Sequence, residues 1–226
     1  MAAARTPVKV CGLTREQDVD AAVAAGVDAV GFVRYPPSPR YVSAERAAQL
    51  ARSLPPFVTP VLLFVNADPE DIATTAAGVP GAVLQFHGDE TPEQCWASAG
   101  EGRLSYLRAA RIPLDPDAQR PDLDRFARDF VRARALLLDA HVTGYGGGGR
   151  SFDWSLLPER IDAHVVLSGG LTADNVGDGI AALRPRCRTL AVDVSSGVEA
   201  GKGIKDERKI IDFVAAVREA DDKAAH

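Results

Sequence analysis

The regular alternation of short apolar runs with amphipathic stretches is the feature that most constrains the fold of this chain. Eight runs rich in β-branched residues start about 20 to 30 residues apart, the length of a strand, a loop and a helix. They are Val8 to Gly12, Ala29 to Val33, Val58 to Val65, Ala82 to His87, Leu104 to Ala110, Ala135 to Ala140, His164 to Gly170 and Thr189 to Gly197. The alternation predicts an α/β fold, a single (β/α)8 TIM barrel.

The length of the chain agrees with one barrel. Its 226 residues match the roughly 200 to 250 residues that α/β barrels use as one domain. No Ser- or Gly-rich linker divides the sequence, so we expect one domain over residues 1–226, with residues 221–226 as a frayed tail. A doubly wound open sheet is the alternative, because the pattern does not prove closure. Both folds place their chemistry at the carboxyl ends of the strands.

Helix starts are marked by side chains that cap helices. Such residues precede four of the amphipathic stretches: Thr14, Asp68, Thr91 and Thr172. Thr91 also forms a capping box with Gln94, and a proline follows both Asp68 and Thr91. The last helix is expected over about Asp206 to Ala220.

Composition and charge exclude several classes of protein. With 46% hydrophobic residues the chain is not disordered, and a formal net charge of -5 argues against a broad nucleic-acid-binding face. The apolar stretch Val61 to Val65 is far shorter than the roughly 20 residues that cross a bilayer. Residues 1–7 lack the apolar segment of a secretory signal. We therefore predict a cytoplasmic protein that binds neither membrane nor nucleic acid.

The chain has 3 cysteines, Cys11, Cys95 and Cys187. They are far apart in the sequence, which fits neither a disulfide framework nor a metal clip, so no metal site is expected. Cys95 and Cys187 are interpreted as small buried residues. Cys11 ends the first strand and shares a strand face with Lys9, a cation that would favour the thiolate. Cys11 is therefore a candidate reactive thiol.

Other strand ends carry further polar residues. Asp139 ends the sixth run, where it is either a working carboxylate or a loop cap. Gln85 and His87 share one strand face, as do Asp193 and Ser195. A lone histidine is more often a satisfied core residue than a catalyst, so the role of His87 stays open.

Glycine and serine follow the seventh and eighth strands. Gly169 and Gly170 come after the seventh, and Ser195 and Ser196 after the eighth. Barrel enzymes commonly bind phosphate through the loops at these two places, although each loop alone could be a tight turn. Together the two loops predict a phosphate site.

Two further loops are candidates for ligand contact. Residues Gly144 to Trp154 contain four consecutive glycines followed by aromatic residues, which indicates a loop that closes over a ligand or lies against one. The proline-rich loop Arg34 to Val42 presents Arg40, either for an anion or for a surface ion pair.

Taken in order from about residue 7 to residue 218, these segments resemble the phosphoribosylanthranilate isomerases of tryptophan biosynthesis. The resemblance lies in Lys9-Val-Cys-Gly-Leu-Thr14, Gly31-Phe-Val33, Ser38-Pro-Arg-Tyr-Val42, Leu63-Phe-Val-Asn66, Gln85-Phe-His-Gly-Asp-Glu90, Leu137-Leu-Asp139, Phe152-Asp-Trp154, Ser168-Gly-Gly-Leu171, Val192-Asp-Val-Ser-Ser-Gly-Val-Glu199 and Gly203-Ile-Lys-Asp206. So many motifs in the right order are highly specific.

The resemblance implies a monomeric or homodimeric barrel that isomerises N-(5-phosphoribosyl)anthranilate to 1-(2-carboxyphenylamino)-1-deoxy-D-ribulose 5-phosphate. The reaction is an Amadori rearrangement that needs neither a metal nor a cofactor. By the family's pattern Cys11 is the general base and Asp139 the general acid. Arg40 matches the residue that meets the anthranilate carboxylate, and Asp193 matches a contact to the sugar hydroxyls.

The same pattern assigns the remaining candidates. Gly169, Gly170, Ser195 and Ser196 fall in the family's phosphate-binding loops. Lys9, Gln85 and His87 are further candidates for substrate binding. Two positions depart from many family members: Gly148 stands where they have threonine, and Arg34 where they have an aromatic residue.

Three other functions are weighed against this one. A lyase such as indoleglycerol-phosphate synthase relies on lysines at strand ends, and here Lys9 is the lysine within a predicted core strand. An isomerase that also serves histidine biosynthesis needs a second phosphate site, for which Asn66 to Asp68 and Gly88 to Glu90 look too acidic. A catalytically silent regulator would have no use for both Cys11 and Asp139.

Overall fold

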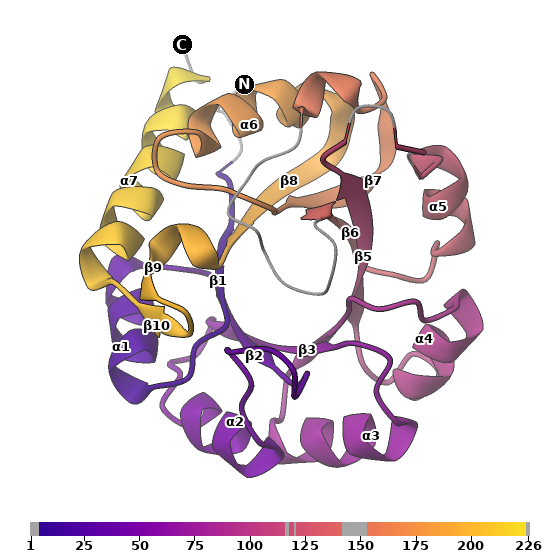
Figure 1. Cartoon of the computed structure of the whole chain (residues 1–226), viewed down its shortest axis with the longest axis vertical. Helices are drawn as coiled ribbons and strands as arrows, with labels where there is room; N and C mark the ends of the chain where they lie inside the picture. Colours follow the sequence, from indigo (N-terminus) through magenta and orange to yellow (C-terminus); the bar gives the residue numbers. More distant parts are fainter. Residues whose placement is uncertain (1–4, 116–117, 120, 142–152, 225–226) are drawn as a thin grey trace.

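The computed structural model describes residues 5–115, 118–119, 121–141 and 153–224. Its eight strands close into a parallel barrel in the order β1 to β8, so the open-sheet alternative is wrong (Figure 1). The strands are β1 Val8–Cys11, β2 Ala29–Val33, β3 Thr59–Phe64, β4 Val83–Phe86, β5 Tyr106–Pro113, β6 Ala135–His141, β7 Ile161–Leu167 and β8 Cys187–Val194.

Helices surround the barrel on all sides (Figure 1). The α-helices are α1 Glu16–Ala25, α2 Ala44–Ala51, α3 Pro69–Gly78, α4 Pro92–Ser98, α5 Leu123–Asp129, α6 Val176–Leu183 and α7 Glu207–Lys223. The described residues also form three short 3-10 helices, η1 Trp154–Leu156, η2 Arg184–Arg186 and η3 Ser196–Val198. A small antiparallel hairpin, β9 Glu199–Gly201 with β10 Ile204–Lys205, lies outside the barrel beside α1 and α7.

Side-chain alternation in β1 decides what faces the inside of the barrel. Val8 and Val10 pack in the large core between strands and helices. Lys9 and Cys11, on the opposite strand face, point into the barrel, as the sequence parity predicts. β1 closes the barrel by pairing with β2 on one side and β8 on the other, and this pairing aligns Lys9 with Asp193.

The expected helix caps are confirmed at two of four positions. The Asp68 side chain caps α3, and Thr91 forms the capping box with Gln94 at the start of α4. The expectation is wrong for Thr14, because its hydroxyl donates to the Gly203 carbonyl and α1 begins at Glu16. It is also wrong for Thr172, because Asn175 occupies the N-cap of α6.

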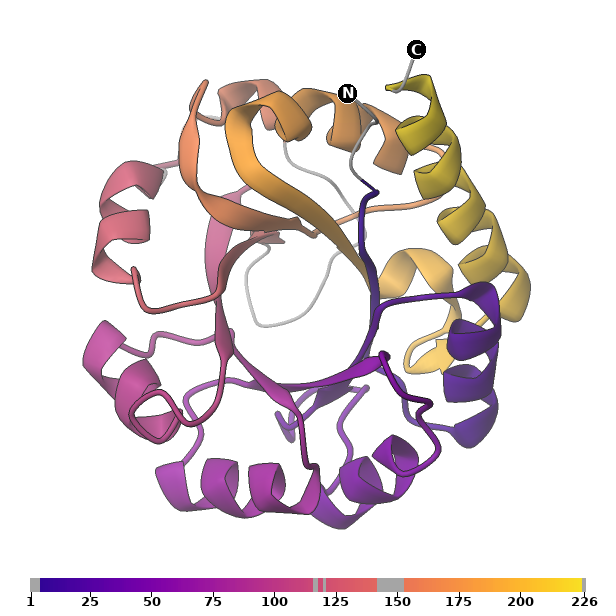
Figure 2. The same ribbon diagram turned by 180° about the vertical axis from the view of Figure 1, so that it is seen from behind.

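The end of the chain is more ordered than expected. Helix α7 continues to Lys223, so the frayed tail predicted from residue 221 is wrong up to that point, and residues 225–226 lie outside the described residues. The reason is Asp221, whose carboxylate accepts from the Thr6 backbone and hydroxyl at 2.7 Å each and also pairs with Arg184. Seen from behind, the two ends of the described chain lie close together (Figure 2).

The boundaries of β7 and β8 also differ from the sequence expectation. Both begin earlier, at Ile161 and Cys187, because exposed polar residues such as Asp162 and Arg188 interrupt the apolar pattern there. Between β6 and β7 the described residues form η1. Within the described ranges, no helix is long and apolar enough to cross a membrane.

Candidate active site

A cavity opens at the carboxyl ends of the barrel strands, the face where barrel enzymes place their active sites. The candidate catalytic, substrate-binding and phosphate-binding residues predicted from the sequence all line it, except Lys9. Its lining consists of Cys11, Val33, Tyr35, Ser38, Arg40, Leu63, Val65, Gln85, His87, Asp139, Ser168, Gly169, Gly170, Leu171, Asp193, Ser195 and Ser196. The closed barrel therefore brings together residues from distant parts of the chain.

Cys11 lies above a buried ion pair. The Lys9 Nζ atom is 2.8 Å from Asp193 Oδ1, and both side chains are almost excluded from water. The space for this arrangement exists because residue 31 is glycine: a Cβ there would lie 2.7 Å from Cys11 Sγ and 3.1 Å from Lys9 Nζ. The absence of a side chain at Gly31 thus lets the thiol and the ammonium group share one side of the barrel interior.

Lys9 is only one of the groups that determine the pKa of Cys11. Burial raises the pKa of the Cys11 thiol above its ordinary value; Lys9 lowers it, and Asp193 raises it again. Lys9 favours the thiolate, as expected, but the net pKa of Cys11 is raised because desolvation outweighs the cation and Asp193 neutralises much of the Lys9 charge. Burial also opposes the charge of Lys9, but Asp193 and Cys11 together raise its pKa.

Asp139 forms a chain of hydrogen bonds with His87 and Gln85. The His87 Nε2 atom is 3.0 Å from Asp139 Oδ2, and Gln85 Nε2 is 3.0 Å from His87 Nδ1. An amide nitrogen can only donate, so His87 Nδ1 accepts and Nε2 carries the proton that is donated to Asp139. Asp139 is consequently a partly buried carboxylate that lines the cavity and is held by the imidazole of His87, while the loop that it would cap, 142–152, lies outside the described residues.

The two loops predicted to bind phosphate lie next to each other across β7 and β8. Gly169 and Gly170 follow β7, and Ser195 and Ser196 follow β8 and begin η3. The Ser195 hydroxyl donates to the Cys11 carbonyl at 3.0 Å. This hydrogen bond ties the loop after β8, one of the two predicted phosphate-binding loops, directly to β1, the strand that carries the Cys11 thiol.

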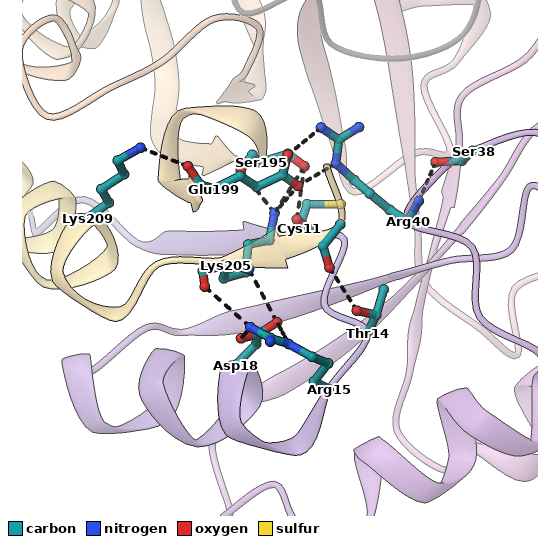
Figure 3. Close-up of polar contacts among 11 residues, drawn as sticks. Cys11, Thr14, Arg15, Asp18, Ser38, Arg40, Ser195, Glu199, Lys205 and Lys209 are labelled. Atoms are coloured by element: carbon teal, nitrogen blue, oxygen red, sulfur yellow. Dashed lines mark hydrogen bonds and ion pairs between the residues drawn. The ribbon is translucent and has the colours of Figure 1, made fainter. Parts of the chain in front are cut away.

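Arg40 is neither exposed nor free. Its Nε and Nη2 atoms donate to Glu199 at 2.7 and 2.9 Å, so the surface ion pair considered from the sequence is a buried one (Figure 3). The departure at Arg34 is explained by its contacts: the side chain donates to Val42 O at 2.7 Å and pairs with Asp71 at 2.6 Å. Arg34 therefore fixes the loop that presents Arg40.

Glu199 and Lys205 are site residues for which the sequence reading proposed no role. The Lys205 Nζ atom is 3.0 Å from Glu199 Oε1. Both side chains are buried, so water screens their attraction very little. A carboxylate two residues after the Ser195–Gly197 loop was a usable signal. Its arginine partner could not be identified, because it lies 159 residues earlier in the chain.

The remaining sequence expectations have mixed outcomes. Cys95 is fully buried in the core, as expected, and burial raises its pKa to about 12. Cys187 is only half-buried. Gly148 and most of the glycine loop fall outside the described residues, while Trp154 packs against the core from η1. Within the described residues, no group of His, Cys, Asp or Glu side chains is arranged to hold a metal ion.

The family of the chain follows from comparison with known proteins. Residues 8–216 match the family described as N-(5'phosphoribosyl)anthranilate (PRA) isomerase. The chain belongs to this family. A protein named N-(5'-phosphoribosyl)anthranilate isomerase from Dechloromonas aromatica is 58% identical over 220 residues, which are 96% of this chain and 99% of that protein. One of the same name from Leptothrix cholodnii is 60% identical over 96% of this chain and 93% of its own.

Solved structures of phosphoribosyl anthranilate isomerases have the same fold. The enzyme from Thermotoga maritima is 41% identical with a TM-score of 0.78, over 95% of this chain and 99% of that one. A second, in complex with reduced 1-(o-carboxyphenylamino)-1-deoxyribulose 5-phosphate, is 38% identical with a TM-score of 0.79 and the same coverage. The protein is therefore an isomerase of this family, which decides against the synthase considered above.

Proposed function

We propose that the protein converts N-(5-phosphoribosyl)anthranilate to 1-(2-carboxyphenylamino)-1-deoxy-D-ribulose 5-phosphate, with Asp139 as general acid and Cys11 as general base. The observation that carries the proposal is that a carboxylate and a thiol from different strands line one cavity, together with Arg40 and the two glycine and serine loops. A substrate with an aromatic carboxylate at one end and a phosphate at the other needs a site of this composition. Family membership and the ligand of the related complex support the same substrate.

Ring opening is the first proton transfer. The lone pair of the anilino nitrogen forms the C1=N bond while the C1–O bond to the ring oxygen breaks, and the oxygen takes the proton of protonated Asp139. Once Asp139 has lost this proton, the Nε2–H of His87 donates to the carboxylate that remains. His87 and Gln85 thus orient the acid and stabilise its product form.

Removal of the C2 proton is the second transfer. The iminium formed by ring opening acidifies this proton, and the Cys11 thiolate accepts it. The C–H electrons become the C1=C2 bond, the C1=N electrons return to nitrogen, and the resulting enol tautomerises to the ketone. Lys9 and Lys205 favour the thiolate against the burial that opposes it. Two groups with opposite protonation states in one site are the usual arrangement for acid–base catalysis at neutral pH.

Substrate binding is divided among the other residues. Arg40 is assigned to the anthranilate carboxylate, and Asp193, fixed by Lys9 and by Ser168 at 3.3 Å, to the sugar hydroxyls. The phosphate is assigned to Gly169, Gly170, Ser195 and Ser196. Backbone N–H groups and hydroxyls at such loops suit a phosphate.

Three broader properties are also part of the proposal. All eight strands share one sheet, which supports a single domain. Three free cysteines suit the reducing cytoplasm. A homodimer is supported by Phe57, whose side chain is 99% exposed, and by the related isomerase from Thermotoga maritima, which is described as dimeric.

Fluorescence of the anthranilate group tests the activity. Purified protein is mixed with freshly prepared N-(5-phosphoribosyl)anthranilate, and we expect fluorescence to be lost faster than by spontaneous hydrolysis, with the ketose phosphate as the product. Prior treatment with a thiol-blocking reagent should abolish the loss. Saturable binding without turnover would instead support a silent regulator and overturn the proposal.

A further inference from the structure

A buried cluster of three charges lies beside the cavity, where the β9–β10 hairpin meets Arg40 from the loop after β2. Glu199 accepts from Arg40 Nε at 2.7 Å and Nη2 at 2.9 Å, and from Lys205 Nζ at 3.0 Å (Figure 3). The exposed fractions of the Arg40, Glu199 and Lys205 side chains are 10%, 6% and 0%. Arg40 and Glu199 thus meet in the two-bond geometry that most strictly fixes a guanidinium plane.

The hairpin that carries Glu199 is itself fixed at several points. Lys205 Nζ donates to the Ser195 carbonyl at 2.9 Å, and Lys209 Nζ donates to the Glu199 carbonyl at 2.8 Å. The Thr14 hydroxyl donates to the Gly203 carbonyl at 2.8 Å. The hairpin therefore joins the loop after β8, the loop after β1 and helix α7 into one support.

Arg40 is held from a second side by the backbone of Gly12. This residue has φ +80, and a Cβ there would lie 2.5 Å from Arg40 Cδ, so the arginine stem lies directly over the glycine. Because Nε and Nη2 both face Glu199, Nη1 has no hydrogen bond to any residue that the structure describes. The third nitrogen of the guanidinium is thus available at the wall of the cavity.

Charge and burial indicate why such a cluster is present. A buried ion pair is a weak source of stability compared with apolar side chains of the same size, so orientation is the better account of its presence. Two cations and one anion leave the cluster with one positive charge. Lys205 balances Glu199, and the charge of Arg40 remains available to an anion in the cavity.

We propose that Glu199 is a positioning residue that orients Arg40 toward the carboxylate of the aromatic amine, with Lys205 as the cation that balances it. The inference rests on the proposed function, because it needs a substrate with that carboxylate. It assigns to the hairpin, rather than to Arg40 alone, the discrimination between amines with and without an ortho carboxylate.

Two substrates that differ only in the carboxylate test this role. The value of kcat/KM is measured for N-(5-phosphoribosyl)anthranilate and for N-(5-phosphoribosyl)aniline, and their ratio reports the discrimination. In Glu199→Gln we expect the ratio to fall roughly tenfold or more, mainly through a higher KM for the anthranilate substrate, since a binding contact is weakened. In an Arg40→Gln background, Glu199→Gln should change the ratio no further.

Three controls separate positioning from folding. Glu199→Gln leaves Lys205 buried without its partner, so Glu199→Gln/Lys205→Met should recover thermal stability while the low ratio persists. Lys209→Met loosens the hairpin through the Glu199 backbone only and should keep the wild-type ratio. If Glu199 only stabilised the fold, Glu199→Gln would lower kcat/KM equally for both substrates and leave their ratio unchanged.

The outcomes distinguish the inference from the activity on which it rests. A wild-type protein that consumes neither substrate overturns both. A wild-type protein that consumes the anthranilate substrate, with Glu199→Gln or the double variant keeping the wild-type ratio, overturns only the role of Glu199. A wild-type ratio near one would show that Arg40 does not read the carboxylate, and it would overturn the inference as well.

Discussion

At the scale of single residues, the base depends on a thiol that its surroundings keep protonated. Burial and Asp193 raise the pKa of Cys11, and Lys9 and Lys205 oppose them without reversing the sign. The active form is the thiolate, so below the raised pKa its population grows with pH. The raised pKa therefore makes the Cys11 thiolate a stronger base, but it also leaves only a small fraction of the thiol ionised at neutral pH.

The raised pKa of Cys11 determines how the reactivity of the thiol depends on pH. We expect the rate at which iodoacetamide alkylates Cys11 to rise by up to about tenfold per pH unit above neutrality, until the thiol is ionised. Mass spectrometry of the labelled Cys11 peptide across about pH 6.5 to 9.5 measures the profile. Cys187→Ala is the control and should reproduce it, because Cys187 does not line the cavity. A profile that levels off below about pH 8.5, the ordinary thiol pKa, would show that Cys11 does not have a raised pKa.

Residue identities in the site could be predicted where sequence position alone determines them. Cys11, Asp139 and Asp193 stand at or next to strand ends, and strand parity placed Cys11 on the inner face with Lys9. The direction of the Cys11 pKa could not be predicted, because it depends on how much water and how much of the Asp193 charge surround the thiol. Glu199 was missed for a related reason, since its partner Arg40 is close only after the barrel closes.

At the scale of elements, the caps show which local signals are reliable. Asp68 and Thr91 precede a proline that starts the helix, so local chemistry determines the boundary. Thr14 lacks such a proline, and its hydroxyl bonds to the distant Gly203 instead. Capping residues therefore predict helix starts best where no tertiary contact competes for the side chain.

The capping box at Thr91 gives a direct stability test. Thr91→Ala removes the acceptor for the Gln94 N–H and should lower the free energy of unfolding by about 1 kcal/mol. Thr172→Ala, at a position that looks like a cap in sequence but is not one, should change it by less than about 0.5 kcal/mol. Urea unfolding of both variants measures the difference. Equal losses in the two variants would contradict the assignment of the caps.

At the scale of the whole molecule, the number and spacing of the apolar runs predicted the barrel, and closure had to be observed. The pairing of β1 with β8 is what aligns Lys9 with Asp193 and brings the phosphate-type loops beside the thiol. An open sheet with the same strands would separate these groups. The site is therefore a property of closure, which no single segment of the sequence encodes.

The proposed homodimer is also a property of the whole molecule. Phe57 projects between Pro56 and Val58 with φ 72, a strained conformation for a bulky residue, and its ring is 99% exposed. We expect Phe57→Asp to convert the dimer into a monomer in size-exclusion chromatography with light scattering. Val131→Asp, which also removes an exposed apolar side chain, should leave the dimer intact. A wild-type protein that is monomeric at every concentration would contradict the proposal.

The roles of Cys11 and Asp139 are the central claim, and the turnover of two variants tests it most directly. With N-(5-phosphoribosyl)anthranilate as substrate, Cys11→Ala and Asp139→Asn should each lose roughly a hundredfold to ten-thousandfold in kcat while keeping the wild-type circular dichroism spectrum. Each loss would place one proton transfer on one residue. Near wild-type turnover in either folded variant would contradict the account.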